Sequence, residues 1–307
     1  MNIVSGTGIN MVTDFTKITF DAKSHTYIYL GRHLMPVTSA LKWVVPEFDT
    51  ETAVASKMVE TGKTRQEILA EWDHKRDTGL ERGTRTHAYI EAVIEQNGVD
   101  VLSTVNDKSH EMLEFDKAWE RMQSVLKAEL FKKEWTIGDA QLGIAGRCDA
   151  IFDIVSGGKK KKILVDWKTG KYMLRKYAKE PMLPPFNEYP NCEEVKYSLQ
   201  LSLYRLIIER NTDMKIDAAY ILHLPSDHEY HMYNTIDFRS EAESWLLTAN
   251  DNGTFGDPIL EKKTEKLITT LDGYSLPKLL MLSPGCRQRL LAKMDRIYTD
   301  VNKIWKA

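Results

Sequence analysis

Cysteine is scarce in this sequence, and its few copies are scattered. The 307 residues include three cysteines, Cys148, Cys192 and Cys286, and none belongs to a Cys-x-x-Cys pair. Iron–sulfur ligand sets and disulfide frameworks use cysteines at paired spacings. Neither is expected here, and a reducing cytoplasm fits the pattern. Cys148 is predicted to be a small buried residue rather than a nucleophile.

Long apolar runs and a dominant charge are also missing. No stretch approaches the length needed to cross a bilayer, and residues 1–5 lack the basic start of a signal peptide. We therefore expect a cytoplasmic protein without a membrane partner. The formal net charge of −2 excludes no class of partner, because a global sum hides local clusters.

The remaining composition is that of an ordinary globular protein, with 42% hydrophobic residues. We expect an N-terminal hairpin and helices over 1–75, a core over 76–236, and a C-terminal helical extension packed on it over 237–307. Within the first segment, residues 18–34 predict a hairpin with a turn at Gly31-Arg32, and Thr38 or Ser39 is expected to cap the next helix.

Two predicted strands carry the residues with the clearest chemistry. Residues 144–155 and 161–168 are rich in β-branched and apolar residues, and Ser156-Gly157-Gly158 between them favours a hairpin turn. In such a hairpin, Asp149 lies across from Asp166. The two-residue period of a strand places Asp166 and Lys168 on the same face.

A face with two carboxylates and a lysine suits a hard divalent cation. Carboxylate oxygens bind Mg²⁺ or Mn²⁺ together with water and substrate phosphate. The cation would lower the pKa of a bound water, while Lys168 would orient that water or stabilise an oxyanion. The alternative is that Asp149 and Asp166 are solvent-facing strand residues and Lys168 is a surface lysine.

Several helices are predicted around this hairpin. Residues 83–94 open a helical segment with His87 and Glu91 on one face, and 193–209 predict an amphipathic helix with Gln200 beside Tyr204. Further helices are expected at 50–72, 107–130, 239–249 and 285–305, and strands at 218–224 and 230–236. His223, His228 and His231 are predicted to be surface histidines rather than a metal site.

These motifs resemble one known family when they are taken in order. A glycine-led helix with His87, then Gly146-Arg147-Cys148-Asp149, then Asp166-Trp167-Lys168-Thr169, then Gln200-x-x-x-Tyr204 looks like the RecB-type branch of the PD-(D/E)XK nucleases. The compact members are the most similar, such as phage exonucleases, CRISPR-associated RecB-like nucleases and the mitochondrial genome maintenance exonuclease. The resemblance covers about residues 18–224.

The resemblance implies a fold and roles for particular residues. The implied fold is an α/β restriction-endonuclease-like core, a mixed central sheet flanked by helices with added helical elements. His87, Asp149, Asp166 and the Trp167 carbonyl would bind Mg²⁺ or Mn²⁺, and Lys168 would be catalytic. Gln200 and Tyr204 would support Lys168 and contact DNA. Some CRISPR-associated relatives hold an iron–sulfur cluster with four cysteines, which this chain lacks.

Basic residues gather around the second strand. Between 156 and 176 there are eight lysines or arginines and one acid. Lys171, Arg175 and Lys176 are candidates for DNA contact, as is Arg147 in the Gly-Arg-x-Asp motif. The lysines at 159–162 either attract phosphates or simply solvate a hairpin tip. Aromatic residues in the same region could stack on single-stranded bases or pin an irregular loop to the core, namely Tyr172, Tyr177, Phe186, Tyr189 and Tyr197.

The expected function is a metal-dependent DNA nuclease in replication, recombination or repair. Analogy with the compact phage-type relatives favours an exonuclease acting on DNA ends or single strands, in the host cytoplasm if the protein is phage-encoded. A helicase or recombinase could deliver the DNA. The alternatives are a structure-specific or site-specific endonuclease and a non-catalytic nucleic-acid-binding protein.

Overall fold

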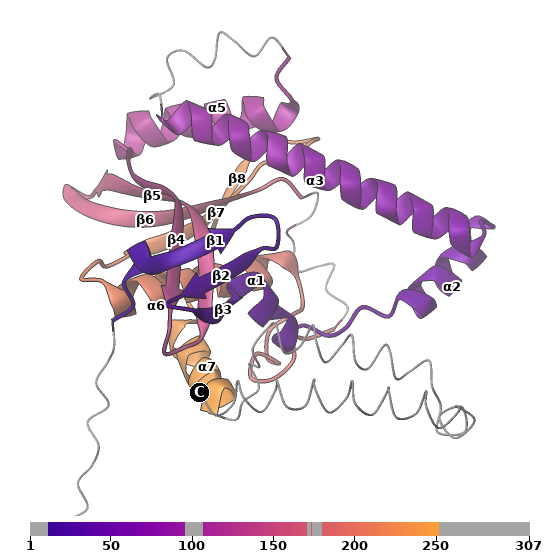
Figure 1. Cartoon of the computed structure of the whole chain (residues 1–307). Helices are drawn as coiled ribbons and strands as arrows, with labels where there is room; N and C mark the ends of the chain where they lie inside the picture. The colour runs from indigo at the N-terminus through magenta and orange to yellow at the C-terminus, as the bar shows by residue number, and fades with distance from the viewer. Residues whose placement is uncertain (1–11, 96–106, 171–172, 174–179, 252–307) are drawn as a thin grey trace, which may run out of the picture.

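A mixed central sheet flanked by helices forms the body of the protein (Figure 1). The computed structural model describes residues 12–95, 107–170, 173 and 180–251. Within these residues the prediction of an α/β fold with a mixed sheet is confirmed. No helix in the described ranges is both long and apolar enough to cross a membrane.

Most strands that neighbour each other in the sheet also follow each other in the order of the sequence. The strands are β1 (Ile18–Asp21), β2 (Thr26–Tyr29), β3 (Arg32–Pro36), β4 (Glu129–Asp139), β5 (Ile144–Ser156), β6 (Lys159–Lys168), β7 (Ala218–His223) and β8 (His231–Asn234). The helices are α1 (Val37–Ala40), α2 (Thr50–Thr61), α3 (Arg65–Glu95), α5 (His110–Leu126), α6 (Glu193–Asn211) and α7 (Arg239–Asp251), with short 3-10 turns at Phe15–Lys17 and Leu41–Val44.

The sheet is organised around the long strand β5. Its order is β1-β2-β3-β5-β6-β7-β8, and β4 pairs with the other edge of β5. β5 is antiparallel to β4 and β6 but parallel to β3, and β6 is parallel to β7. The predicted β5–β6 hairpin is confirmed: Gly157 and Gly158 have φ values of 60° and 72° at its turn, which glycine adopts at little cost.

The ladder along one edge of β5 changes partner at the Gly-Arg-Cys-Asp motif. The pairing with β3 ends at Ala145, and the pairing with β6 begins at Ala150. Residues 146–149 therefore lie between the two neighbouring strands. Along this edge the described strands leave residues 146–149 without a ladder partner, and this gap in the ladder is the opening between β3 and β6.

Helices cover both faces of the sheet. α5 and the C-terminal part of α3 lie on one face, and α1, α6 and α7 lie on the other (Figure 1). The first layer buries a cluster that includes Ile90, Phe115 and Trp119 against Phe152 and Trp167. The second layer buries the apolar side of α6 against alternate residues of the same strands, including Ile151 and Leu164. The sheet thus contributes to a core on each side.

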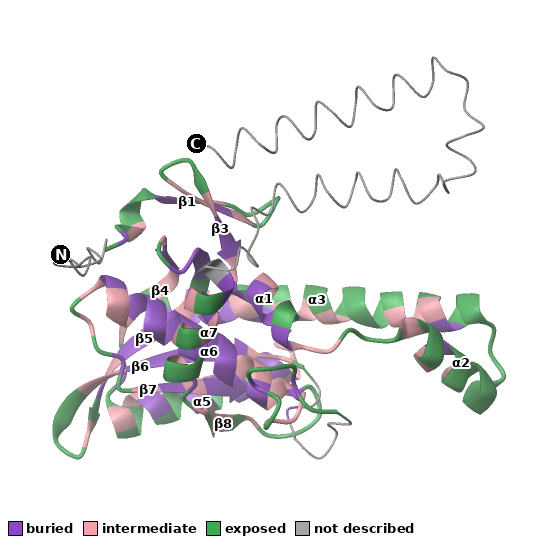
Figure 2. Ribbon diagram, turned by 90° about the horizontal axis from the view of Figure 1, so that it is seen from below, coloured by how far each residue is buried: buried purple, intermediate pink, exposed green. Residues whose placement is uncertain are grey.

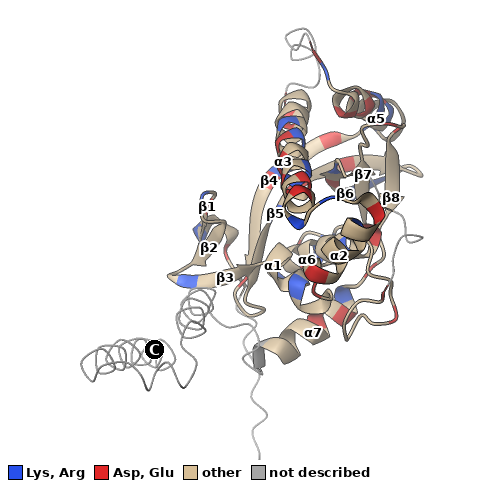
Figure 3. Ribbon diagram, turned by 90° about the vertical axis from the view of Figure 1, so that its right-hand side faces the viewer, with Lys and Arg blue, Asp and Glu red and all other residues tan. Residues whose placement is uncertain are grey.

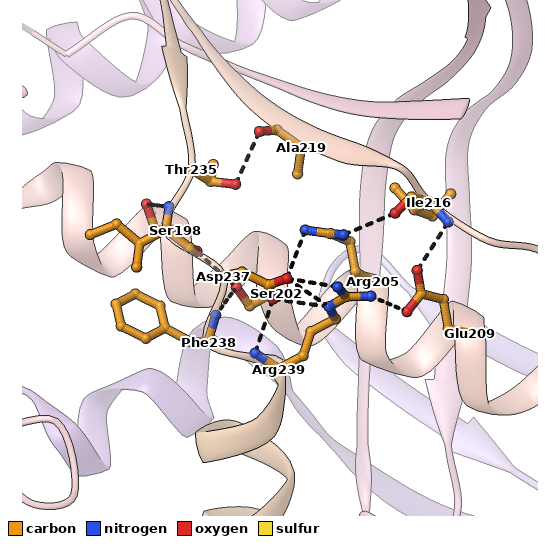
Figure 4. Close-up of polar contacts among 11 residues, drawn as sticks. Ser198, Ser202, Arg205, Glu209, Ile216, Ala219, Thr235, Asp237, Phe238 and Arg239 are labelled. Carbon is orange, nitrogen blue, oxygen red and sulfur yellow. Dashed lines mark hydrogen bonds and ion pairs between the residues drawn. The ribbon is translucent and has the colours of Figure 1, made fainter. Parts of the chain in front are cut away.

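Polar contacts fix α6 between the sheet and α7 (Figure 4). Ser202 donates to the carbonyl of Ile236 and accepts from the N–H of Phe238, at 3.1 and 2.9 Å. Arg205 is buried and donates to the carbonyl of Ile216. Arg239, which begins α7, pairs with Glu209 of α6. Because α6 is anchored in this way, its side chains near the sheet are held in place.

The long helix α3 differs from the prediction that a helical segment opens at Gly83. It begins at Arg65, runs through Gly79 and Gly83, and projects from the body together with α2 (Figures 1 and 2). Thr64 and Glu67 form a capping box, in which each side chain accepts from the other residue's N–H. Only the end next to the sheet is extensively buried, through Tyr89, Ile90, Val93 and Ile94.

Other local predictions also need correction. Residues 18–36 form three strands instead of one hairpin, and β3 pairs with β5, so this segment contributes to the central sheet. Neither Thr38 nor Ser39 caps α1, which follows Pro36 without a side-chain cap. The domain boundaries stay predictions, and the expected helix at 285–305 lies outside the described residues.

Candidate metal centre

The two predicted aspartates lie close together at the opening between β3 and β6. Asp149 lies on β5 directly before the ladder to β6 begins, and Asp166 lies near the end of β6. The N–H of Trp167 donates to Asp149 Oδ2 at 3.0 Å, which ties the side chain to the neighbouring strand. The side chain of Asp149 is 13% exposed and that of Asp166 is 2% exposed. Two nearly buried carboxylates therefore share one site.

Lys168 completes the strand end as predicted. Its Nζ lies 2.6 Å from Asp166 Oδ2, a buried oxygen to which the described residues offer no other hydrogen-bond partner. Burial alone would lower the pKa of Lys168, but the carboxylates of Asp166 and Asp149 raise it above its ordinary value. The ammonium therefore stays charged at neutral pH in the metal-free protein.

His87 reaches the same site from α3. Its Nδ1 lies 4.0 Å from Asp149 Oδ2, and its ring approaches the carbonyl of Trp167 closely enough to hydrogen bond. Burial, followed by the charge of Lys168, lowers the pKa of His87. A neutral imidazole is the form that binds metals. The four predicted ligand positions, His87, Asp149, Asp166 and the Trp167 carbonyl, are thus neighbours.

Glu134 is a site residue that the sequence did not reveal. His87, Glu134 and Asp149 each offer a ligand atom within 4.8 Å of the others. Glu134 lies inside β4 with φ at 44°, a strained value for a residue with a side chain. Its Oε2 also pairs with Arg147 Nε at 2.7 Å. The nearest signal in the sequence is an acid between Lys133 and Trp135 in a predicted strand region, and such an arrangement is common elsewhere.

The crowded acids explain why this arrangement suits a cation. Burial first, and then the nearby charge of Asp166, raises the pKa of Asp149 well above its usual range. Burial also raises the pKa of Glu134, to which Glu91 and Asp166 add. Like charges that repel one another in a poorly solvated place are stabilised by a bound divalent ion. Oxygen and imidazole donors of this kind fit Mg²⁺ or Mn²⁺.

Gln200 and Tyr204 lie beside the site but contact each other. Gln200 Nε2 donates to the Tyr204 hydroxyl at 3.0 Å. The ring of Tyr204 packs on Gly146, where an added Cβ would lie 2.4 Å from Tyr204 Cε1. The structure therefore explains the glycine of the Gly-Arg-Cys-Asp motif by space for Tyr204. The described contacts of the Lys168 ammonium are instead with Asp166 and the ring of Tyr197.

Of the residues predicted to contact nucleic acid, Arg147 lies within the described ranges. Arg147 is 41% exposed but is paired with Glu134. Lys171, Arg175 and Lys176 lie outside the described residues. Lys162 pairs with Asp153 at 2.6 Å and lies over the ring of Phe131 on the exposed hairpin. The projecting part of α3 carries acids and bases side by side and is not a basic stripe (Figure 3).

The aromatic residues expected near the site divide between different environments. Phe186 is buried against Phe238 and Trp245, and Tyr189 packs edge-on against Phe238. These two residues pin the chain to the core, as one of the alternatives proposed. Tyr197 lies on α6, while Tyr172 and Tyr177 fall outside the described residues.

The prediction that His223 is a surface residue is wrong. His223 ends β7, is 2% exposed, and donates through Nε2 to the carbonyl of Gly170. β7 runs parallel to β6 in register, so His223 lies opposite Lys168 in the interior of the sheet. Burial lowers its pKa. His223 therefore holds the chain that follows Lys168.

Cys148 is buried, as predicted, and contacts the carbonyl of Trp135 through its sulfur. Burial raises the pKa of its thiol, so it is a poor nucleophile.

Neither a family model nor a curated protein is recognisably similar to this chain. Functional assignment therefore depends on the geometry of the site.

Proposed function

We propose that this protein is a metal-dependent DNA nuclease of the RecB-type PD-(D/E)XK group. The observation that carries the proposal is the convergence of His87, Asp149, Asp166 and Lys168 at the opening between β3 and β6. These side chains come from α3, β5 and β6. Segments this far apart in the sequence would not gather a histidine, two buried acids and a lysine by local folding alone.

The chain offers a ligand set for Mg²⁺ or Mn²⁺. His87, Asp149, Asp166 and the Trp167 carbonyl would hold the ion, and Glu134 is a further candidate ligand. When bound, the ion would activate water and neutralise charge on the phosphate. The buried acids would be relieved of their mutual repulsion, which favours occupancy over the empty site.

Lys168 would act as a fixed positive charge. Because its pKa is raised, it is protonated at neutral pH and cannot serve as a general base in the metal-free state. The ammonium would instead donate hydrogen bonds to the attacking water or to a phosphate oxygen during in-line displacement. His87 would remain neutral and oriented by the Trp167 carbonyl.

The mixed sheet flanked by helices supports the proposed family but does not indicate the substrate. A mixed sheet with a central antiparallel hairpin and helices on both faces is compatible with a restriction-endonuclease-like core. Exonuclease action on DNA ends or single strands, and delivery of DNA by a helicase or recombinase, remain proposals from analogy with compact phage-type relatives.

The test compares circular and linear single-stranded DNA incubated with the protein and Mg²⁺ or Mn²⁺. Loss of the linear form alone supports an exonuclease, and cutting of the circle supports an endonuclease. Asp166→Ala and Lys168→Ala should each lower the rate by about a hundredfold or more. Lys162→Ala, a lysine on the same strand but at the hairpin, is the matched control and should keep full activity.

The competing class is a non-catalytic nucleic-acid-binding protein. It predicts no cutting of either substrate with either ion, together with retained DNA binding. Equal residual activity in the wild type, Asp166→Ala and Lys168→Ala would indicate a contaminant, and the proposed site would then be wrong.

A further inference from the structure

Tyr197 lies directly beside the lysine of the candidate site. It belongs to the first turns of α6, one turn before Gln200. The Nζ of Lys168 lies 4.7 Å from the centre of the Tyr197 ring. A cation within about 6 Å of an aromatic centroid is attracted to the electron-rich face of the ring. Lys168 therefore has two described partners, the carboxylate of Asp166 and this ring.

The surroundings keep both partners in place. The Lys168 side chain is 20% exposed, so solvent screens the contact weakly. Tyr197 packs against the core cluster beneath α6, and α6 is anchored further along by Ser202 and Arg205. Glu193, one turn earlier on the same helix, lies near the Tyr197 hydroxyl, and together with burial it keeps the phenol neutral by raising its pKa. The ring is thus held as an uncharged platform.

We propose that Tyr197 is a positioning residue for the nuclease reaction, and that its ring holds the Lys168 ammonium in the orientation needed at the scissile phosphate. The inference rests on the proposed function. It assigns the support of the lysine to the ring of Tyr197 rather than to Gln200 and Tyr204, which bind each other. The hydroxyl of Tyr197 is not required for this role.

The chemistry of the side chain gives a direct test. Tyr197→Phe keeps the ring face, whereas Tyr197→Leu and Tyr197→Met remove it but leave a side chain of comparable bulk. We expect Tyr197→Phe to keep kcat within about twofold. The two aliphatic variants should lose about tenfold in kcat, the size expected for a poorly solvated cation–π contact, with unchanged KM for DNA.

A second measurement does not depend on activity. Limited acetylation with a small amount of reagent, followed by peptide mass spectrometry, reports how exposed each lysine is. Labelling of Lys168 should rise severalfold in Tyr197→Leu and Tyr197→Met and stay unchanged in Tyr197→Phe. Lys133 is the internal reference, because its Nζ pairs with Glu95 at 2.8 Å and does not contact Tyr197. Its labelling should not change.

The outcomes separate this inference from the proposed function. If the wild type cuts no DNA but the labelling follows the expected pattern, the nuclease proposal fails while the contact between Tyr197 and Lys168 stands. An equal loss in Tyr197→Phe and Tyr197→Leu would assign the effect to the hydroxyl and overturn the inference. A raised KM with unchanged kcat would indicate base stacking and also overturn it. Thermal melts identify any variant that fails to fold, in which case the other aliphatic variant decides.

Discussion

The lack of a side chain at Gly146 allows Tyr204 of α6 to pack closely on the sheet. Gly146 is buried on β5, and the missing side chain is what lets the Tyr204 ring lie against the strand. The ring is held from its other end by Gln200. Crowding here involves an aromatic ring locked by a helix, which cannot move aside as a flexible chain end can.

Gly146→Ala is therefore expected to destabilise the protein by about 1–3 kcal/mol, because the new Cβ would overlap the Tyr204 ring. Urea unfolding measures the change. In a Tyr204→Ala background, where the ring is gone, the same substitution should cost much less. Gly138→Ala on β4 is the matched control without an aromatic ring, since its new Cβ would meet the terminal methyl groups of Ile18 and Leu34 and the Cβ of Ala145 at 2.8, 3.0 and 3.2 Å. Equal costs of Gly146→Ala in both backgrounds would refute the explanation.

At the scale of elements, the hairpin β5–β6 was predictable and the length of α3 was not. Alternating apolar residues and a Gly-Gly turn specify a hairpin locally, and that hairpin places Asp149, just before the paired residues of β5, beside the end of β6 that carries Asp166. Gly79 and Gly83 resemble breaks in a helix, but the capping box at Thr64 starts α3 much earlier. Glu134 escaped prediction because its place in the site depends on an unusual φ within β4.

The interior glycine of α3 leads to a prediction for the helix. Gly79 has open space around the position of an added Cβ. Gly79→Ala should stabilise the protein by about 0.5–1 kcal/mol, because alanine loses less backbone entropy than glycine on forming a helix. Thermal unfolding measures the gain, and cleavage rates should not change because Gly79 lies two turns before His87 on the projecting side. A decrease in stability would mean that the helix bends there.

At the scale of the whole molecule, the candidate metal centre is a place where the charges of the gathered acids oppose folding. Strands and helices from across the chain gather ionisable groups whose raised pKa values show that their charged forms are unfavourable in the metal-free state. His223 illustrates the same dependence on tertiary structure. Its burial follows from the parallel pairing of β7 with β6, which no local pattern in the sequence encodes. Such a site should make stability depend on both pH and metal.

The sign of the pH effect follows from the raised pKa of Asp149. Below the unfolded pKa of about 4, the carboxyl is protonated in both states and costs nothing. As the pH rises towards the folded pKa, the unfolded state ionises first and the metal-free fold loses stability. Asp149→Asn removes this penalty while keeping an oxygen that can accept from the Trp167 N–H. In EDTA, the variant should therefore match the wild type near pH 4 and exceed its melting temperature increasingly towards pH 8.

At neutral pH, Mn²⁺ should reverse the order of the melting temperatures of the wild type and Asp149→Asn. A bound ion stabilises the ionised wild-type site in proportion to its occupancy, whereas the variant lacks one charged ligand. At pH 7.5, millimolar Mn²⁺ should raise the melting temperature of the wild type clearly and that of Asp149→Asn little. Asp153→Asn, which removes an acid on the same strand that pairs with Lys162, is the control and should keep the full response. A response to Mn²⁺ that is equal in all three proteins would place metal binding elsewhere, because only the wild type and Asp153→Asn retain the complete set of acids at the opening between β3 and β6.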